Sequence, residues 1–155
     1  MSEKITNGEQ VMSLAFLSAT ALAEKIRRGA VSSVALTECF IERIERLDKE
    51  INAVVVRTFK DARRAALAAD QAAANGKWLG PLHGVPMTIK ESYAMAGTPT
   101  TWGIEQFRHN LASKDGLIVQ RFRQSGAHFL GKTNVPVDLA DFQSYNPIYG
   151  VTGNP

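Results

Sequence analysis

Hydrophobic residues in the first third of the chain recur at the spacing of amphipathic helices. Leu22 and Ile26 share one face of a segment that Ser18 can cap and that Gly29 can end. Ser32 can then begin a longer helix, in which charged residues lie opposite an apolar face. That apolar face consists of Phe40, Ile41, Ile44 and Leu47. The pattern therefore predicts two consecutive helices within a helical start of about residues 11–50.

After residue 50 the pattern alternates between short β-branched segments and helical segments. The predicted strands cover residues 53–57, 87–92 and 127–130. The predicted helices cover residues 61–74 and 115–124, with a short helical turn over 137–142. Strands that alternate with helices are typical of an α/β fold with parallel strand pairs, and this is the fold class that we expect.

The composition is that of an ordinary globular domain. The chain has 155 residues, of which 45% are hydrophobic and 21% charged, and a domain of this size forms a core without disulfides or a structural metal. Its 18 Lys and Arg residues are interspersed with 15 Asp and Glu residues and form no basic stripe. No apolar run approaches the roughly 20 residues that span a bilayer. We therefore expect neither a nucleic acid nor a membrane as a partner.

Two features bear on the cellular compartment. Residues 11–21 superficially resemble the apolar core and cleavage site of a secretion signal, but Glu3 and Glu9 precede them and the pattern continues smoothly into the first helix. Cys39 is the only cysteine, which excludes an internal disulfide framework and a multi-cysteine zinc site. We interpret Cys39 as a small apolar residue within its helix, and we expect a cytoplasmic protein.

Residues 126–133 match G-x-x-x-x-G-K-T, the sequence pattern of a phosphate-binding loop. A functional loop of this kind follows a strand and opens a helix whose N-terminus faces the phosphate. Here a predicted helix precedes Gly126, the four middle residues are strand-like, and Pro136 stands where the next helix would begin. We therefore predict a strand in this segment and no nucleotide binding.

The other polar and aromatic candidates form no recognisable site in the sequence. The histidines at positions 83, 109 and 128 lack the spacing of metal ligands, and no serine stands in a Gly-x-Ser-x-Gly segment. Four aromatic residues lie in predicted loops: Tyr93, Trp102, Tyr145 and Tyr149. These side chains either form the wall of a cleft or cover an edge of the core, and the sequence leaves both interpretations open. We expect no metal and no cofactor.

Lys90 is the strongest candidate for chemistry that the residues themselves suggest. It lies in a predicted strand whose preceding residues, from Met87 to Ile89, all tolerate an interior position. A strand lysine usually extends its amine to water. Burial would instead lower the pKa of the amine and give a neutral group that can accept a proton. The residues alone leave both possibilities open.

Three blocks carry a more specific pattern: residues 80–90, 96–103 and 126–134. In order and spacing they resemble the amidase signature family, and the helix pair from residue 17 to 33 and the tail from 145 to 155 also fit. The resemblance extends over essentially the whole chain. It implies a mixed β-sheet flanked by α-helices, and it identifies residues 1–155 as the N-terminal part of a single amidase domain that is incomplete at its C-terminal end.

The resemblance also implies an activity, the hydrolysis of a carboxylic amide to a carboxylate and ammonia or an amine by a Ser-cisSer-Lys triad. Lys90 matches the family's catalytic lysine, and we expect it to lie buried beside a cavity with no carboxylate neutralising it. Family members continue beyond the position of Pro155 into the segment that holds both serines and the oxyanion loop. The implied partners are a small amide substrate and the remainder of an amidase polypeptide, without which the chain is expected to be inactive.

The chain differs from the family pattern at one position, and two other functions are compatible with its sequence. Many family members carry Asp-Asn or a close variant where this chain has Glu91-Ser92, which bears on substrate placement rather than on the role of Lys90. The chain is alternatively a non-catalytic fragment, or the amidase-type subunit of a tRNA-dependent amidotransferase. The lack of a basic stripe in the sequence favours a hydrolase of small amides over direct tRNA binding.

Overall fold

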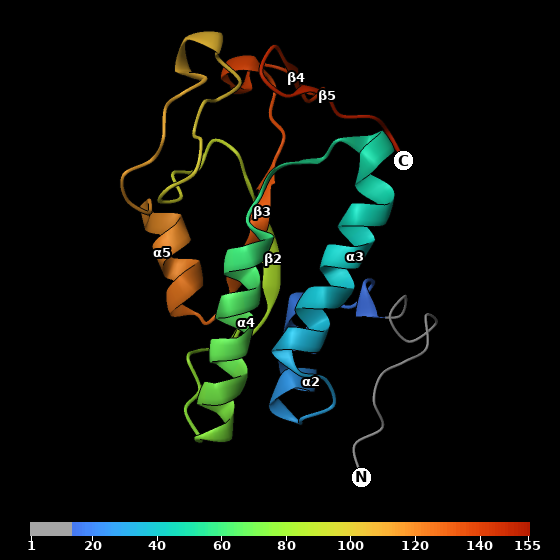
Figure 1. Ribbon diagram of the computed structural model, residues 1–155, viewed down its shortest axis with the longest axis vertical. Helices are drawn as coiled ribbons and strands as arrows, with labels where there is room; N and C mark the ends of the chain where they lie inside the picture. Colours follow the sequence, from blue (N-terminus) through green and yellow to red (C-terminus); the bar gives the residue numbers. More distant parts are fainter. Residues whose placement is uncertain (1–13) are drawn as a thin grey trace.

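The structure, a computed structural model, describes residues 14–155 and begins with the two helices that the hydrophobic pattern predicts (Figure 1). Helix α2 spans Ala19–Arg27 and helix α3 spans Ser33–Ile51. The hydroxyls of Ser18 and Ser32 accept backbone N–H groups of the first turns at 3.2 and 3.0 Å. Both predicted caps are thus confirmed. The parts of the helical start and of the signal-like run before residue 14 lie outside the described residues.

Between residues 53 and 155 the strands and helices lie close to their predicted positions. The strands of the main sheet are β1 (Val54–Arg57), β2 (Pro86–Lys90) and β3 (His128–Thr133). The longer helices are α4 (Phe59–Ala74) and α5 (Leu117–Gln124). Shorter elements are η1 (Glu105–Phe107), η2 (Val137–Leu139), β4 (Tyr145–Asn146) and β5 (Gly150–Val151). No helix in the described part of the chain is long and apolar enough to cross a membrane.

The C-terminal third differs in detail from the sequence-based expectation. The helical turn predicted over residues 137–142 is shorter, because Asp138 and Leu139 adopt positive φ angles of 53° and 59° that interrupt a right-handed helix. Strand β3 extends to Thr133, beyond its predicted end at residue 130. The small antiparallel hairpin of β4 and β5 was not predicted.

The main sheet is mixed, with the strand order β1-β3-β2. Strand β3 lies in the centre, parallel to β2 and antiparallel to β1. The expectation of parallel strand pairs is therefore right for β2 and β3 but wrong for β1. Periodicity within a strand reports which face is buried and carries no information on the direction of a distant neighbour.

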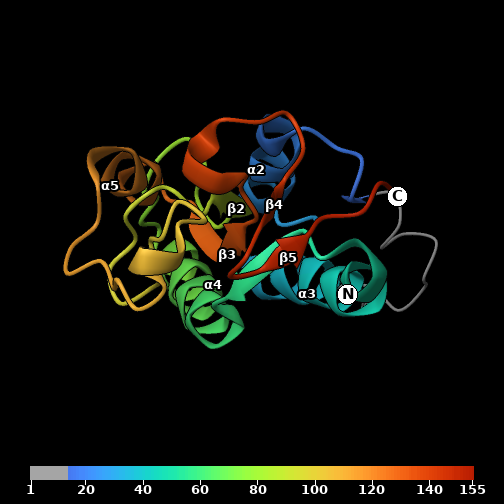
Figure 2. The same cartoon turned by 90° about the horizontal axis from the view of Figure 1, so that it is seen from above.

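The side chains of β3 lie on both faces of the sheet, and the strand contains a bulge. The pairing with β2 skips Leu130, which is therefore an extra residue in β3. Phe129 packs with Val119 of α5, whereas Leu130 packs with Ile41 of α3 and Ala62 of α4. The sheet thus lies between α5 on one side and α3 and α4 on the other (Figures 1 and 2).

The segments that follow β2 and β3 gather at one end of the molecule, together with η1, η2 and the β4–β5 hairpin (Figure 1). The N–H of Asp138 donates to the carbonyl oxygen of Trp102 at 2.9 Å, which links the segment after β3 to the segment after β2. Ligands of open α/β sheets bind outside the carboxyl ends of parallel strands. A functional site is therefore to be sought at this end.

Candidate functional site

Lys90 is the last residue of β2, and its side chain is exposed. Because strand side chains alternate between faces, Lys90 and Thr88 lie on the face opposite the buried Ile89. The expected burial of Lys90 is thus not found within residues 14–155. Strand β2 forms an edge of the main sheet in residues 14–155.

An open groove of about 380 Å³ lies between α3 and the sheet. Leu130 and Thr88 line it from the sheet, and three hydrophobic residues that the sequence pattern placed on one helix face line it from α3: Phe40, Ile44 and Leu47. Their neighbour Ile41 is fully buried in the core. The predicted apolar face of α3 is therefore real, but part of it borders an open groove rather than a closed core. Thr88 connects the groove to the face of β2 that carries Lys90.

Glu91 follows Lys90 and is fully buried at the carboxyl end of β2. Its two carboxylate oxygens accept the backbone N–H groups of Thr101, at 2.8 Å, and of Trp102, at 3.0 Å. The hydroxyl of Tyr149 donates to the same carboxylate at 3.0 Å. Burial, together with the nearby charge of Glu91, raises the pKa of Tyr149 to about 12, so this hydroxyl stays protonated and remains a donor.

Lys132 is the buried lysine of the described residues, with no exposed surface. Its amine donates to the carbonyl oxygen of Pro99 and to the hydroxyl oxygen of Thr100, the latter at 3.0 Å. Burial lowers the pKa of this amine to about 8, and the charge of Glu91 opposes the shift. Glu91, directly after β2, and Lys132, in β3, thus hold one loop, residues 99–102.

Neither of these two buried residues was assigned a role from the sequence. Glu91 was noted only as a departure from a family pattern, although it stands two residues after the buried Ile89 and therefore on the same face of the chain. Lys132 was considered only as part of the phosphate-loop match, although the apolar pair Phe129-Leu130 precedes it. Strand alternation was the signal that could have placed Glu91 inside. The bulge at Leu130, which brings Lys132 into register with Ile89, has no such signal in the sequence.

The phosphate-loop match of residues 126–133 has the structure that was predicted for it. Helix α5 ends before Gly126, and the following residues form β3 at the centre of the sheet. The N–H of His128 donates to Val85, and the carbonyl oxygen of Leu130 accepts the N–H of Thr58. The backbone of this segment is therefore occupied by sheet hydrogen bonds and forms no cradle for a phosphate.

We expect no saturable binding of ATP to this protein. The lysine of the match, Lys132, is buried and already donates to Thr100 and Pro99, so it has no free amine to offer a phosphate. Isothermal titration calorimetry with Mg-ATP tests this. Saturable binding that disappears in Lys132→Ala would contradict it.

The histidines are held separately by backbone and hydroxyl partners. His83 accepts the N–H of Leu79 at 3.0 Å, and its other ring nitrogen lies 3.1 Å from the carbonyl oxygen of Ala69. His128 lies 2.9 Å from the hydroxyl of Thr37, and burial lowers its pKa to about 4, so its ring is neutral. The third histidine, at position 109, is exposed. Within residues 14–155, no group of His, Cys, Asp and Glu side chains is arranged to hold a metal ion.

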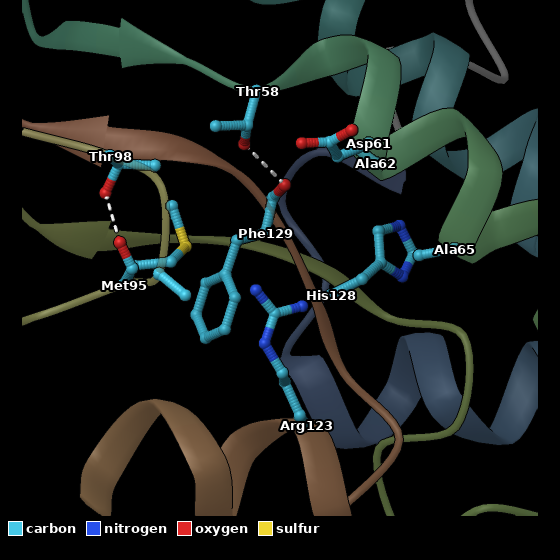
Figure 3. Close-up of a pocket in the computed structure, with 10 residues that line it drawn as sticks. Thr58, Asp61, Ala62, Ala65, Met95, Thr98, Arg123, His128 and Phe129 are labelled. Carbon is cyan, nitrogen blue, oxygen red and sulfur yellow. Dashed lines mark hydrogen bonds between the residues drawn. The ribbon is translucent and has the colours of Figure 1, made fainter. Parts of the chain in front are cut away.

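Figure 3 shows a smaller pocket, of about 40 Å³, between α4, β3 and the loop after β2. Two hydroxyls at its wall already donate hydrogen bonds within the protein. Thr58 donates to the carbonyl oxygen of Phe129 at 3.0 Å, and Thr98 donates to that of Met95 at 2.7 Å. A volume of this size admits a few water molecules, whereas ligand pockets of proteins measure roughly 300–1,000 Å³. This pocket is a packing feature rather than a substrate site.

The loop aromatics divide into two groups. Tyr149 is half-buried and bonded to Glu91, so it belongs to the structure of the strand end. The side chains of Tyr93, Trp102 and Tyr145 are exposed by 42, 43 and 45%. These three therefore do not close an edge of the core within the described residues.

The comparison with protein families settles the membership of this chain. The family model described as Amidase matches residues 35–155. The chain belongs to the amidase family. An acylamidase of Rhodococcus erythropolis is 37% identical over 142 residues, which are 92% of this chain and 30% of that protein. A glutamyl-tRNA(Gln) amidotransferase subunit from Thioalkalivibrio sulfidiphilus is 37% identical over 134 residues, which are 86% of this chain and 28% of that protein.

The structural comparison agrees with this membership. A solved structure of a fatty acid amide hydrolase matches with a TM-score of 0.89 at 29% identity, over 97% of this chain and 26% of that chain. The expected fold, a mixed sheet flanked by helices in the manner of the amidase signature enzymes, is thereby confirmed. This amidase chain spans 30% of the length of its acylamidase relative.

Proposed function

We propose that this chain contributes the lysine of a Ser-cisSer-Lys triad that hydrolyses a carboxylic amide to a carboxylate and ammonia or an amine. The observation that carries the proposal is the position of Lys90, whose amine extends from the carboxyl end of a strand that is parallel to the central strand of the sheet. Catalytic groups of α/β proteins concentrate at such strand ends. The amidase family supplies the reaction class.

The chemistry requires a second polypeptide segment. A serine hydroxyl becomes a good nucleophile only when a base accepts its proton, and a lysine is a base only while it is neutral. In the proposed triad, Lys90 takes a proton from the cis-serine, which takes one from the nucleophilic serine as it attacks the amide carbonyl. Backbone N–H groups of a glycine-rich loop stabilise the oxyanion, and the proton held by Lys90 passes back through the cis-serine to the amine as the C–N bond breaks. A water molecule then attacks the acyl-serine ester, giving its proton to the same base, and the carboxylate is released as the proton returns to the serine.

Because Lys90 is exposed in residues 14–155, the proposed chemistry needs a further segment that covers it. We propose that residues 1–155 are the N-terminal part of one amidase domain, and that the remainder of an amidase polypeptide covers the Lys90 side of β2. Such a cover would withdraw the amine from water and favour its neutral form, which the chemistry requires. The partners are thus this polypeptide and a small amide, and neither a nucleic acid nor a membrane. We place the reaction in the cytoplasm.

A second candidate function is that of the amidase-type subunit of a tRNA-dependent amidotransferase. The 37% identity to the amidotransferase protein of Thioalkalivibrio sulfidiphilus favours it. The dispersed charges of this chain favour instead a hydrolase that releases ammonia or an amine freely. The two functions differ in whether product ammonia appears in solution or on a glutamyl-tRNA.

The 155-residue chain by itself is expected to hydrolyse no amide, because a base without its relay serine and nucleophile has nothing to activate. The protein as its gene encodes it, purified with any polypeptide that accompanies it, is expected to hydrolyse simple aryl amides. Intact mass spectrometry decides whether 16.9 kDa is the whole molecule, and arylamine release measures activity. Hydrolysis by the 155-residue chain alone would contradict the proposal. Inactivity of the native protein towards amides and glutamyl-tRNA would favour the non-catalytic alternative.

A further inference from the structure

We propose that Glu91 is a positioning residue for Lys90, which it serves by fixing the carboxyl end of β2 to two loops. This inference rests on the proposed role of Lys90 in amide hydrolysis. Glu91 directly follows Lys90, and its side chain points to the opposite, covered face of the sheet. It therefore acts through the backbone of Lys90 and does not touch the substrate.

The need for an anchor follows from the position of Lys90. Within residues 14–155, strand β2 is an edge strand, and Lys90 is its last residue. Strand ends at an edge have hydrogen bonds on one side only, and the lowest-energy local openings of proteins begin at such places. Beyond Lys90, the ladder with β3 continues through one contact, in which the N–H of Glu91 donates to Thr133 at 2.9 Å. The backbone of Lys90 is otherwise held by its pairing with Thr133 and by the N–H of Tyr93, which donates to its carbonyl oxygen at 3.0 Å. A further constraint on this strand end would fix the position of the Lys90 amine more closely.

The carboxylate of Glu91 supplies that constraint through three donors. The N–H groups of Thr101 and Trp102 bind it from the loop after β2, and the hydroxyl of Tyr149 binds it from the loop between β4 and β5. Hydrogen bonds to a charged group are stronger than those between neutral groups. The end of β2 is therefore tied to segments 10 and 58 residues further along the chain.

The backbone of Trp102 indicates that these contacts hold a strained conformation. Trp102 has a φ of 56°, which is uncommon for a bulky residue. Such strain persists where the surroundings over-determine it, and it concentrates at functional sites. Here the N–H of Trp102 binds Glu91 and its carbonyl oxygen accepts the N–H of Asp138 at 2.9 Å.

Lys132 makes a buried carboxylate at this place tolerable. An unpaired buried charge is strongly unfavourable, whereas one with an opposite charge nearby and satisfied hydrogen bonds is stable. The amine of Lys132 binds Thr100 and Pro99, the residues just before those that bind Glu91. The two charges thus hold the same loop.

The test uses Glu91→Gln, which keeps the shape of the side chain but removes its charge and replaces one acceptor by a donor. A matched control is Glu105→Gln, an exposed glutamate that pairs with Arg108. The first readout is amide hydrogen exchange at Thr101 and Trp102, measured in the protein as its gene encodes it. Exchange is expected to accelerate by about 10- to 100-fold in Glu91→Gln and to stay unchanged in Glu105→Gln.

The second readout separates positioning from general stability. Because a displacement of about 1 Å in a reacting group can cost about 10²-fold in rate, Glu91→Gln is expected to lower kcat by about 10- to 100-fold with little change in KM. Glu91→Asp, which restores the charge at a shorter reach, should recover part of kcat. If Glu91→Gln does not fold, Tyr149→Phe carries the test, since it removes one donor and leaves the charge. It should lower kcat several-fold at constant KM.

The outcomes distinguish this inference from the proposed function. Unchanged exchange at Thr101 and Trp102 in Glu91→Gln, or a kcat no lower than that of Glu105→Gln, would overturn the positioning role and leave Lys90 as the base. A Lys90→Ala protein that retains activity would remove the proposed function, whereas the exchange result would stand by itself as a property of the loop.

Discussion

Replacing Lys90 by alanine is expected to reduce amide hydrolysis by about 10²- to 10⁴-fold, the range that a positioned general base contributes. The loss should fall on kcat, because an amine that accepts the proton of the relay serine acts in the transition state and contributes little to binding. The fold should persist, since no part of residues 14–155 buries the Lys90 side chain and its removal leaves no cavity in the core that these residues form. Steady-state kinetics and thermal unfolding of the purified protein measure both effects.

Lys60→Ala is the matched control for this experiment. Lys60 is an exposed lysine on α4, so its removal changes the net charge equally. It should leave both activity and stability unchanged. Lys132 would be a poor control, because it is buried and bonded to Thr100 and its loss would disturb the loop. A Lys90→Ala variant with near wild-type kcat would remove Lys90 from the triad.

The local structure of this chain could be predicted well from its sequence. Ser18 and Ser32 cap their helices as expected, because capping depends on a hydroxyl and a backbone N–H within one turn. The strand inside the phosphate-loop match could be predicted for a similar reason, since strand-forming residues follow a helix end at Gly126. Each of these features is decided by residues a few positions apart.

Features that depend on distant segments could not be predicted in this way. The antiparallel approach of β1 to β3 brings together segments that lie far apart along the chain, and nothing in either strand specifies its direction. The burial of lysines was assigned to the wrong residue for the same reason. Lys90 lies on an edge strand and is exposed, whereas Lys132 lies on the central strand, under a loop that binds its amine.

The catalytic role of Lys90 could be predicted only from the resemblance to a family. Periodicity placed Lys90 on a strand and left its exposure open, and no pattern in the residues themselves pointed to amide chemistry. The buried carboxylate of Glu91 shows what strand alternation can add when it is followed past the strand's end. The residue next to a candidate base is then a candidate for holding it.

Gly131→Ala is expected to destabilise the protein by about 3 kcal/mol, at the upper end of the range for overpacking. Gly131 lies in β3, between β1 and β2, and it faces Arg57 in the register of β1. A Cβ atom at this position would overlap the carbonyl oxygen of Val56 and would lie 3.1 Å from a methyl group of Val54. Because the overlap is with backbone, it can be relieved only by moving β1 away from the central strand.

The expected change in melting temperature is a decrease of about 6–12 °C, measured by circular dichroism. Gly116→Ala provides the matched control, since the nearest atom to its Cβ would be the carbonyl oxygen of Ala94 at an ordinary 3.5 Å. This variant should lose less than about 1 kcal/mol, the cost of alanine at a helix N-cap. Equal melting temperatures for the two variants would contradict this prediction. They would mean that β1 can move away from β3 with little loss of unfolding free energy, and that the pairing of β1 with β3 contributes little to the stability of the sheet.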